Sequence, residues 1–483
     1  MENVDRLAPV IILLSTGGLV LLADLFVRRK GWLVALALLG AGASLAWSAG
    51  LARREMQGTA FSGTVSVDNF TLFFYFLFPL VAAFVIMGSV DYLERLRGRE
   101  GEFLALVLAI AGGAMVLAGG RDLIVIFVAL ELTSISQYAL AGFQRDQKSA
   151  EAGLKYLLLG AVSSSVLLYG MALLYGISGT TSLEGIAQTV AAGEEGVRTG
   201  LVAAMVFLVA GFGFKMAVVP FQMWVPDVYE GSPTPVTAYL SVGSKAAGFA
   251  VVLRVFFQGL GGDFLSDDWS TLFAVIAALS MTLGNVVALT QSNIKRLLGY
   301  SSVAQAGYFL VGLAAVSGEN GFQVGGAGVL FFLAGYAFTN LAAFIAVIAI
   351  SGRIGSDRIA DYAGVWRRSP FLALMLAFAL VSLTGIPPTV GFIAKLYIFN
   401  AAVQADLVWL VVVAVVNTAI SAYYYLAVVR TMFAAEPAEA GRFGPSAVTG
   451  VALTVAALGV LVFGVVPAPL IDAAEAAVRT FGQ

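Results

Sequence analysis

Long apolar runs, separated by short polar or glycine- and proline-containing stretches, dominate the chain. A membrane-spanning helix needs roughly 20 consecutive apolar residues. We therefore predict an all-α polytopic membrane protein with about 14 transmembrane helices, the first of which is expected to remain as a span and not to be a cleaved signal. The predicted spans are 8–27, 32–51, 70–90, 103–117, 123–141, 156–177, 201–221, 236–257, 272–289, 297–316, 329–350, 371–403, 407–429 and 448–466.

Two of these spans contain prolines and a lysine. The seventh carries Lys215 and then Pro220, and the twelfth carries Pro387 and Pro388 before Lys395. Proline removes a helix hydrogen bond, and irregular backbone survives at membrane depth only where protein or a wet cavity surrounds it. Both spans are therefore predicted to be broken helices.

The two broken spans lie five helices apart, which predicts an internal repeat. An odd offset reverses the direction of crossing, so two five-helix units would be related by a two-fold axis in the membrane plane, as in inverted-repeat transporters. The predicted units are three N-terminal transmembrane helices in 1–102, one inverted repeat in 103–260, the second in 261–432, and a last transmembrane helix with a tail in 433–483.

Composition narrows the possible chemistry. Hydrophobic residues make up 60% of the chain and charged residues 12%, against about 25% charged in soluble domains. The net charge of -2 provides no basic field for nucleic acid. The chain has no cysteine and no histidine, which excludes iron–sulfur ligation, disulfides and His-ligated metals. We expect no cofactor or metal in this chain, so proton or ion chemistry must use Lys, Glu, Asp, Tyr and water.

The basic residues of the loops are distributed unequally. If successive loops alternate sides, the richer side is cytoplasmic by the positive-inside rule, and both termini lie on the outer side of a cell (inner) membrane. The richer side receives Arg28, Arg29, Lys30, Arg95, Arg97, Arg99, Arg145, Lys148, Lys155, Lys295, Arg296, Arg353, Arg358, Arg367, Arg368, Arg430 and Arg442, and the other receives Arg6, Arg53, Arg54, Arg121, Arg198, Arg254 and Arg479.

The three remaining basic residues, Lys215, Lys245 and Lys395, fall inside spans, and Glu131 lies in the middle of another. Arg254 is expected toward the outer end of its span, outside this central set. Each central charge costs about 2.5–3.5 kcal/mol on insertion scales, and intramembrane ionisable residues are functional by default. A buried ion pair that only fixes helix register is the alternative, but three lysines and one acid do not pair simply.

Lysine and glutamate together suit proton transfer. The proton affinity of a lysine depends on its burial and on nearby carboxylates, so movement of Glu131 relative to Lys215 would load or unload a proton. Polar side chains of neighbouring spans would order water between the charges, although each is also an ordinary helix–helix contact. The main candidates are Ser241, Gln305, Tyr308 and Tyr425, with Ser134, Ser244, Asn285, Thr339, Asn340 and Asn417 beside them.

The stretch 224–235 is acidic and proline-rich, and it lacks Lys and Arg although it is assigned to the cytoplasmic side. A rigid turn is the favoured interpretation, because proline and glycine account for most of its composition. An ion-binding site is the alternative.

Four stretches, 122–143, 212–237, 293–308 and 382–399, resemble the antiporter-like membrane subunits of proton-pumping NADH:quinone oxidoreductase, respiratory complex I. With the helix count, the resemblance covers nearly the whole chain. Lys395 stands where the middle type of subunit places Glu, and Gln305 where the other two types tend to place His. The chain also stops shortly after the fourteenth span, whereas the largest type is longer and carries a lateral helix. The resemblance is therefore to the N-type subunit.

That resemblance implies roles for the central residues. Glu131 and Lys215 would be the coupled pair, Lys245 the central relay, and Lys395 the terminal donor or acceptor toward the outside. Flavin, iron–sulfur clusters, NADH and quinone would bind other subunits. The implied partners are other antiporter-like and small membrane subunits, a peripheral redox arm and the lipid bilayer.

Three alternatives remain open. A subunit of a multisubunit sodium/proton antiporter would use the same Glu and Lys residues without a redox partner. A stand-alone transporter would need a midplane pocket for a small solute. A purely structural scaffold would leave the three central lysines unexplained.

Overall fold

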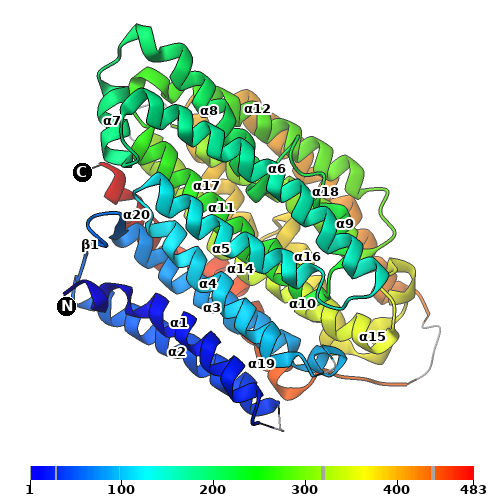
Figure 1. Ribbon diagram of the computed structural model, residues 1–483. Coiled ribbons are helices and arrows are strands. Elements are labelled where there is room, and N and C mark those ends of the chain that lie inside the picture. The colour runs from blue at the N-terminus through cyan, green and yellow to red at the C-terminus, as the bar shows by residue number, and fades with distance from the viewer. Residues whose placement is uncertain (1, 28–29, 97, 317–320, 437–440, 483) are drawn as a thin grey trace.

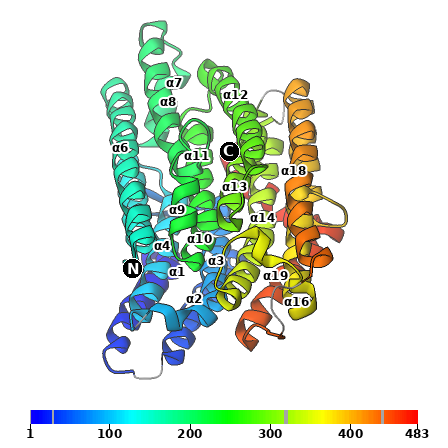
Figure 2. The same cartoon turned by 90° about the vertical axis from the view of Figure 1, so that its right-hand side faces the viewer.

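The computed structural model describes residues 2–27, 30–96, 98–316, 321–436 and 441–482, and it is a bundle of long helices (Figure 1). Figure 2 shows the long helices running in similar directions along the bundle. Twelve of them are α1 (Glu2–Asp24), α2 (Gly31–Arg53), α3 (Asn69–Leu93), α4 (Glu100–Gly119), α5 (Leu123–Ala141), α6 (Gln147–Ser178), α8 (Glu195–Met216), α12 (Asp263–Ala288), α13 (Ile294–Ala314), α14 (Gly321–Ile354), α18 (Val408–Ala434) and α19 (Ala447–Val465).

A further span, Thr234–Gly259, is a composite helix that alternates between α-helical and π-helical turns. Its parts are α10 (Thr234–Tyr239), the π-helix η2 (Leu240–Ser244), α11 (Lys245–Arg254) and the π-helix η3 (Val255–Gly259). Single π turns inside α-helices are frequent at functional sites. With this span, the described residues contain 13 helices long and apolar enough to cross a membrane, which confirms the predicted all-α polytopic class.

The predicted run 371–403 is not one helix but two, α16 (Pro370–Thr384) and α17 (Val390–Gln404). Each has 15 residues, a rise of about 22 Å, which is less than the roughly 30 Å core of a bilayer. Gly385 ends α16 with a left-handed conformation at φ 89°, which glycine adopts readily. The two short helices occupy the place of the twelfth predicted span.

The seventh predicted span breaks in a comparable way. Helix α8 ends at Met216, and Ala217 takes a left-handed conformation at φ 61°. The short helix α9 (Val225–Gly231) continues beyond the irregular segment. Helix α8 therefore ends four residues before Pro220, and α16 ends three residues before Pro387 and four before Pro388. The peptide bonds preceding Pro220 and Pro388 are cis.

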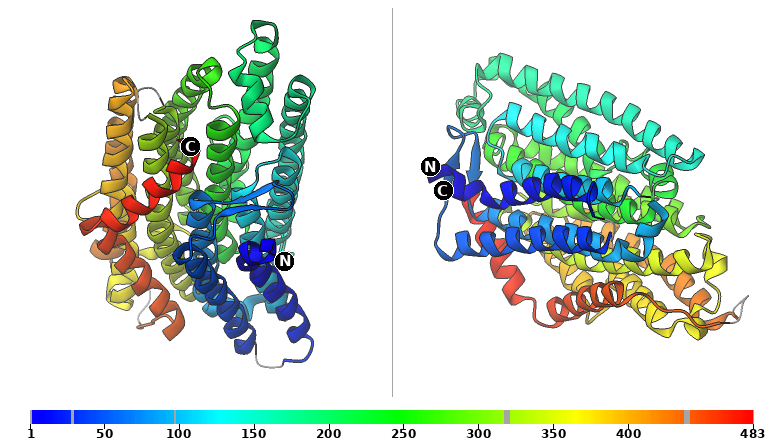
Figure 3. Two further views of the ribbon diagram at one scale, coloured as in Figure 1. Left: turned by 90° about the vertical axis from the view of Figure 1, so that its left-hand side faces the viewer. Right: turned by 60° about the horizontal axis from the view of Figure 1, so that its bottom comes forward.

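Several short elements at the ends of the bundle were not predicted. Strands β1 (Gly58–Ala60) and β2 (Val65–Val67) form an antiparallel hairpin, and α7 (Leu183–Ala191) is amphipathic. Helix α20 (Ala468–Val478), red in Figure 3, packs against α14 and α3. A search for apolar runs of spanning length cannot find such segments. The remaining short helices are the 3-10 helices η1 (Glu94–Leu96), η4 (Ile359–Tyr362) and η5 (Arg479–Gly482), and α15 (Val365–Arg368).

Polar caps fix where several spans begin. Asp122 precedes α5, and its carboxylate accepts hydrogen bonds from the N–H groups of Ile124 and Val125 at 2.8 and 3.4 Å. Asn293 caps α13 in the same way. Such caps satisfy N–H groups that have no partner inside the helix, so they set the register in which α5 and α13 present their side chains to the interior.

Both termini lie at one end of the bundle, next to the β1–β2 hairpin and α7, and α15 lies at the opposite end (Figure 1). This agrees with an even number of membrane crossings. The side of the membrane that each end faces stays a prediction. Of the basic residues assigned to the cytoplasmic side, Arg28, Arg29 and Arg97 lie outside the described residues.

Arg254 forms a buried ion pair that joins distant parts of the chain. Its guanidinium contacts the Asp68 carboxylate at 2.6 and 2.9 Å and lies between the rings of Phe70 and Phe481. It also donates to the carbonyl of Ala118. Burial alone would raise the pKa of the Asp68 carboxyl, but the adjacent Arg254 guanidinium holds that pKa well below its usual range. The pair ties the start of α3 to the end of α11 and to the C-terminal segment.

Candidate functional site

Lys215 lies in the last turn of α8, immediately before the break, and is 3% exposed. Its Nζ donates hydrogen bonds to Thr133 Oγ1 and Ser134 Oγ, both at 3.1 Å, and to Gln137 Oε1 at 3.0 Å. All three acceptors are neutral side chains of α5. The lysine is thus held by α5 through three oxygens that an ammonium group can satisfy with its three protons.

Glu131 is also on α5, but it points elsewhere. Thr133, Ser134 and Gln137 of α5 contact Lys215, whereas Glu131, one turn before Ser134, reaches α6. The Glu131 carboxylate accepts a hydrogen bond from Ser164 of α6 at 2.5 Å. Within the described residues no ion pair joins Glu131 to Lys215: the ammonium of Lys215, on α8, binds Thr133, Ser134 and Gln137 of α5, whereas Glu131 of α5 binds Ser164 of α6.

Gln137 connects Lys215 to the next helix. Its Oε1 accepts hydrogen bonds from Ser244 Oγ at 3.1 Å and from the hydroxyl of Tyr156 at 3.0 Å, in addition to the one from Lys215. Ser244 directly precedes Lys245 in the composite helix. One amide oxygen therefore bridges the first central lysine to the segment that carries the second.

Lys245 begins α11, directly after the π-helical turn η2, and is 2% exposed. Its Nζ donates to the main-chain carbonyls of Ser302, at 2.7 Å, and Met216, at 3.2 Å. Met216 is the last residue of α8. Carbonyls at a helix C-terminus lack partners within the helix and carry the negative end of its dipole, so the break in α8 creates an acceptor for this ammonium.

Lys395 repeats this arrangement at the second break. Its Nζ donates to the carbonyl of Thr384 at 2.9 Å and contacts that of Leu383 at 3.4 Å, both at the C-terminal end of α16. The ammonium also lies 4.5 Å from the centre of the Tyr308 ring, a cation–π distance. Gln305 Nε2 donates to the Leu383 carbonyl at 3.1 Å. The predicted residues Lys395, Gln305 and Tyr308 therefore meet at one helix end.

The other predicted supporting residues line the same interior. Ser241 Oγ accepts from Asn340 Nδ2 at 2.7 Å, and the hydroxyl of Tyr425 contacts that of Ser301. Pro220, Pro387 and Pro388 differ, because they are exposed on the surface of the chain beside the two breaks. The prolines therefore mark the breaks, and among the described residues no hydrogen bond joins them to the lysines.

Hydroxyl groups surround Ser302, whose carbonyl accepts from Lys245. Ser302 Oγ contacts the hydroxyls of Tyr229, at 3.4 Å, and Tyr336, at 3.3 Å. Several polar atoms buried in the interior have no hydrogen-bond partner among the described residues, and buried polar groups of this kind are commonly satisfied by internal water. They are Gln137 Nε2, Tyr239 OH, Gln305 Oε1 and Asn340 Oδ1.

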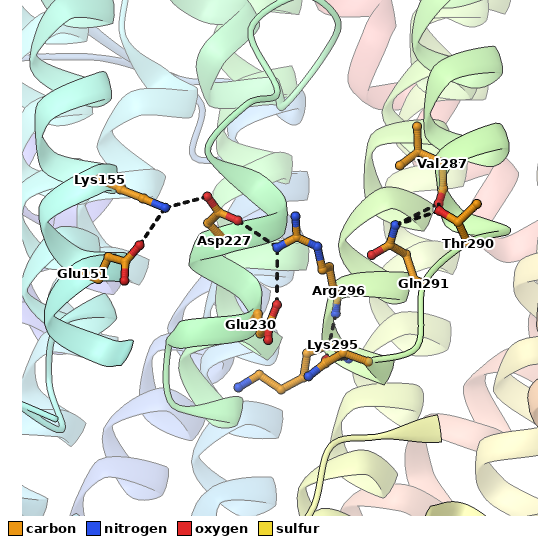
Figure 4. A network of polar contacts seen from close by, with 10 residues as sticks. Glu151, Lys155, Asp227, Glu230, Val287, Thr290, Gln291, Lys295 and Arg296 are labelled. Atoms are coloured by element: carbon orange, nitrogen blue, oxygen red, sulfur yellow. Dashed lines mark hydrogen bonds and ion pairs between the residues drawn. The ribbon is translucent and has the colours of Figure 1, made fainter. Parts of the chain in front are cut away.

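The acidic stretch 224–235 is not simply a turn. Helix α9 presents Asp227 and Glu230 to basic residues of neighbouring helices, as Figure 4 shows. Asp227 contacts Lys155 at 2.8 Å and Arg296 at 2.7 Å, and Arg296 also reaches Glu230 at 3.3 Å. Burial would raise the pKa of Asp227, but the hydrogen bonds from Lys155 and Arg296 lower it. Neighbouring helices thus supply the basic charge that the stretch itself lacks.

An ion-binding site in that stretch receives no support. Among the described residues, no group of three or more His, Cys, Asp or Glu side chains could hold a metal ion. The acids of α9 instead have basic partners, which fix α9 against α6 and α13. The rigid-turn interpretation was wrong for 225–231, which is helical, whereas the prolines at 233 and 235 do border the turn into α10.

Sequence reasoning missed several residues that contact the predicted ones. They are Thr133 and Gln137 beside Lys215, Ser164 beside Glu131, Ser302 through its carbonyl beside Lys245, and Thr418, whose hydroxyl lies 2.9 Å from that of Tyr308. One signal was available on α5, because Thr133, Ser134 and Gln137 are spaced to share one face of a helix. The carbonyls of Met216 and Thr384 gave no signal, since any residue type supplies a carbonyl. Only the location of each helix end shows which carbonyls are free.

Comparison with known proteins gives consistent matches along the chain. A family model described as "NADH:quinone oxidoreductase/Mrp antiporter, TM" matches residues 120–421. NADH-quinone oxidoreductase subunit N of Dehalococcoides mccartyi is 46% identical over 479 residues, which are 98% of this chain and 99% of that protein. A chain of respiratory complex I from Thermus thermophilus is 34% identical with a TM-score of 0.80, covering 96% of this chain and 98% of that one. A chain of the Mrp complex from a Dietzia species has a TM-score of 0.88 at 21% identity, over 99% and 97% of the two chains, and shows likeness of fold alone.

Proposed function

Because the chain belongs to the NADH:quinone oxidoreductase/Mrp antiporter family, we propose that it is the N-type membrane-arm subunit of a proton-pumping NADH:quinone oxidoreductase. It translocates protons across the membrane while electrons pass from NADH to quinone in other subunits. The observation that carries this proposal is the series of three buried lysines, Lys215, Lys245 and Lys395, each held by oxygen acceptors at or beside a broken or π-helical segment.

The proposed proton path runs from Glu131 through Lys215 and Lys245 to Lys395. Hydrogen bonds support the step from Lys215 toward Lys245, because Gln137 accepts from both Lys215 and Ser244, the residue before Lys245. Between Lys245 and Lys395, the path would pass Ser302, whose carbonyl accepts from Lys245. It would then pass Gln305, which donates to the Leu383 carbonyl beside Lys395. Glu131 would act from its own face of α5, changing the field at Lys215 as its contact with Ser164 forms or breaks. Water bound to the unpartnered polar atoms would complete the path.

The two breaks support the inverted repeats proposed for 103–260 and 261–432. In each, a helix ends at a residue with left-handed backbone, Ala217 or Gly385, and a proline follows three residues later. In each, a lysine donates to carbonyls at the end of the interrupted helix. Half-helix ends that hold ions near the midplane are typical of transporters built from inverted repeats.

The assembly follows from the same proposal. The chain would contact neighbouring antiporter-like and small membrane subunits, and a peripheral redox arm would hold NADH, flavin, iron–sulfur clusters and the quinone site. It would lie in the cell (inner) membrane with the end that carries α15 in the cytoplasm and both termini outside, as the positive-inside rule assigns.

A pumping assay tests the proposal directly. The whole complex with Lys215→Ala is reconstituted into vesicles, and proton uptake is measured per quinone reduced. We expect pumping per electron to fall while the complex stays assembled. Lys148→Ala is a matched control, because Lys148 is an exposed lysine at the start of α6. Unchanged pumping and turnover with Lys215→Ala would contradict the proposal and make the lysine a structural element.

The sodium/proton antiporter remains the second candidate. A chain of the Mrp complex shares the fold at 21% identity, whereas subunit N of Dehalococcoides mccartyi matches at 46% identity over nearly the full length of both chains. Purification of the chain with flavin- and iron-sulfur-containing partners favours the oxidoreductase. Purification with membrane subunits only, with sodium-dependent proton exchange, favours the antiporter.

A further inference from the structure

An intramembrane groove lies outside the lysine axis, along α1, α4 and α5, which lie side by side in Figure 1. It encloses about 500 Å³ and exposes mainly apolar surface, a volume within the usual range of small-molecule sites. Its walls include Leu14, Gly18 and Leu21 of α1, and Ala105 and Ala109 of α4. The interval from Leu14 to Leu21 rises about 10 Å along the helix axis, which lies within one leaflet of a bilayer.

One end of this groove is charged. Arg99, Glu102 and Arg145 line it there, so its charged groups sum to one excess positive charge. The Arg99 guanidinium donates to the carbonyl of Phe143 at 2.8 Å and lies 5.3 Å from the centre of the Phe143 ring, which holds it at the mouth. Arg145 is exposed, and its side chain has no hydrogen bond or ion pair within the described part of the chain. Both arginines lie in loops assigned to the cytoplasmic side, whose leaflet carries anionic lipid.

We propose that this groove binds one anionic glycerophospholipid, with an acyl chain along α1 and α4 and the phosphate between Arg99 and Arg145. Charge complementarity selects this occupant over an apolar helix of another subunit, because a guanidinium pair suits a phosphate group. Basic pockets between transmembrane helices on the cytoplasmic side recognise lipid headgroups in this way. The bound lipid would fill the space between the N-terminal helices and the helix that carries Glu131.

Glycines make the proposal testable without damage to the fold. A Cβ atom added at Gly18 would meet no atom within 4 Å, so the side chain of Gly18→Leu starts in open space and extends along the groove. Gly42 of α2 is likewise open and does not line the groove, which makes Gly42→Leu the matched control. Arg145 has a left-handed backbone at φ 58°, so Arg145→Asn removes the charge with a residue that tolerates this conformation. Arg430→Gln is its control, since Arg430 is exposed and distant in sequence.

The purified complex is stripped of lipid and titrated with dioleoyl-phosphatidylglycerol or dioleoyl-phosphatidylcholine. Adducts on this chain are then counted by native mass spectrometry. We expect Arg145→Asn to weaken phosphatidylglycerol binding by about fivefold, the effect of one basic side chain at an anionic surface, with little change for phosphatidylcholine. Gly18→Leu should abolish the adduct for both lipids. Glu102→Gln, which removes the only acid among the described residues that line the groove, should strengthen phosphatidylglycerol binding.

Three results would overturn the proposal. The first is a phosphatidylglycerol adduct that survives Gly18→Leu. The second is equal loss in the controls Gly42→Leu and Arg430→Gln. The third comes from a photoreactive residue at Leu21, which is 44% exposed in the groove: crosslinking to another subunit, and not to a phospholipid, would identify the occupant as protein. Because the readout is lipid binding, these results do not depend on the pumping role proposed for the lysines.

Discussion

The three central lysines differ in what holds each ammonium group. Lys215 is bound by side chains of α5, whereas Lys245 and Lys395 are bound by main-chain carbonyls. A side-chain acceptor can be removed by substitution, but a carbonyl remains whatever residue carries it. The hydrogen bonds of Lys215 are therefore the part of the proposed path that a point mutation can address most selectively.

Gln137→Leu tests the link between the first two lysines. The change keeps a side chain of similar size but removes the oxygen that accepts from Lys215, Ser244 and Tyr156. A hydrogen bond to a charged group contributes about 1.5–3 kcal/mol, so we expect the pumping rate to fall by about tenfold or more. Proton uptake by vesicles with the whole complex measures this. Gln188→Leu, at an exposed position on α7, should leave the rate unchanged, and an equal fall in both variants would count against a specific role.

The residue types of the site were predictable, but their partners were not. Lysine and glutamate inside apolar runs stand out in any sequence, so Glu131 and the three lysines were identified without coordinates. The contact of Glu131 was not, because opposite charge suggests a pair with lysine but does not show that the carboxylate accepts from Ser164 of α6. The partners of Lys245 and Lys395 are carbonyls, and only three-dimensional structure shows where helices end.

Among the helices and strands, too, some were predictable from the sequence and others were not. Apolar runs located the long spans, since length and hydrophobicity are what a membrane selects. Prolines located the two breaks only approximately, because each helix ends at a left-handed residue three positions earlier, Ala217 or Gly385. Hairpin β1–β2 and helices α7 and α20 follow short-range patterns at the bundle ends, which span-length reasoning does not cover.

Exchanging alanine and glycine at the two helix ends should have opposite effects on stability. A non-glycine residue with left-handed backbone costs about 1–2 kcal/mol, so Ala217→Gly should leave the complex as stable or slightly more stable. Gly385→Ala should destabilise it by about that amount, and the added methyl would lie 3.0 Å from Cδ of Lys395. Thermal unfolding of the two complexes in detergent measures the difference. Loss of stability in Ala217→Gly, together with no change in Gly385→Ala, would show that the left-handed caps do not set the breaks.

At the scale of the whole molecule, the ion pair of Arg254 and Asp68 connects three regions of the chain that are distant in sequence. It joins the start of α3 to the end of α11, and the ring of Phe481 covers it from the C-terminal segment. Removing one partner of a buried pair leaves the other charge without compensation, which typically costs about 3–5 kcal/mol. Arg254→Met should therefore destabilise the chain more than Asp68→Asn combined with Arg254→Met, because the double variant leaves no buried charge.

The same pair predicts how stability depends on pH. The pKa of the Asp68 carboxyl is depressed in the folded chain, whereas the pKa of an aspartate in an unfolded chain is about 3.9. A depressed folded pKa adds stability that is fully present above the unfolded pKa and is lost as the pH falls toward the folded one. The stability difference between wild type and Asp68→Asn, measured by denaturant unfolding in detergent, should therefore be constant above about pH 5 and shrink below about pH 4. A difference that instead grew on acidification would mean that the Asp68 carboxylate is not stabilised by Arg254 in the folded protein.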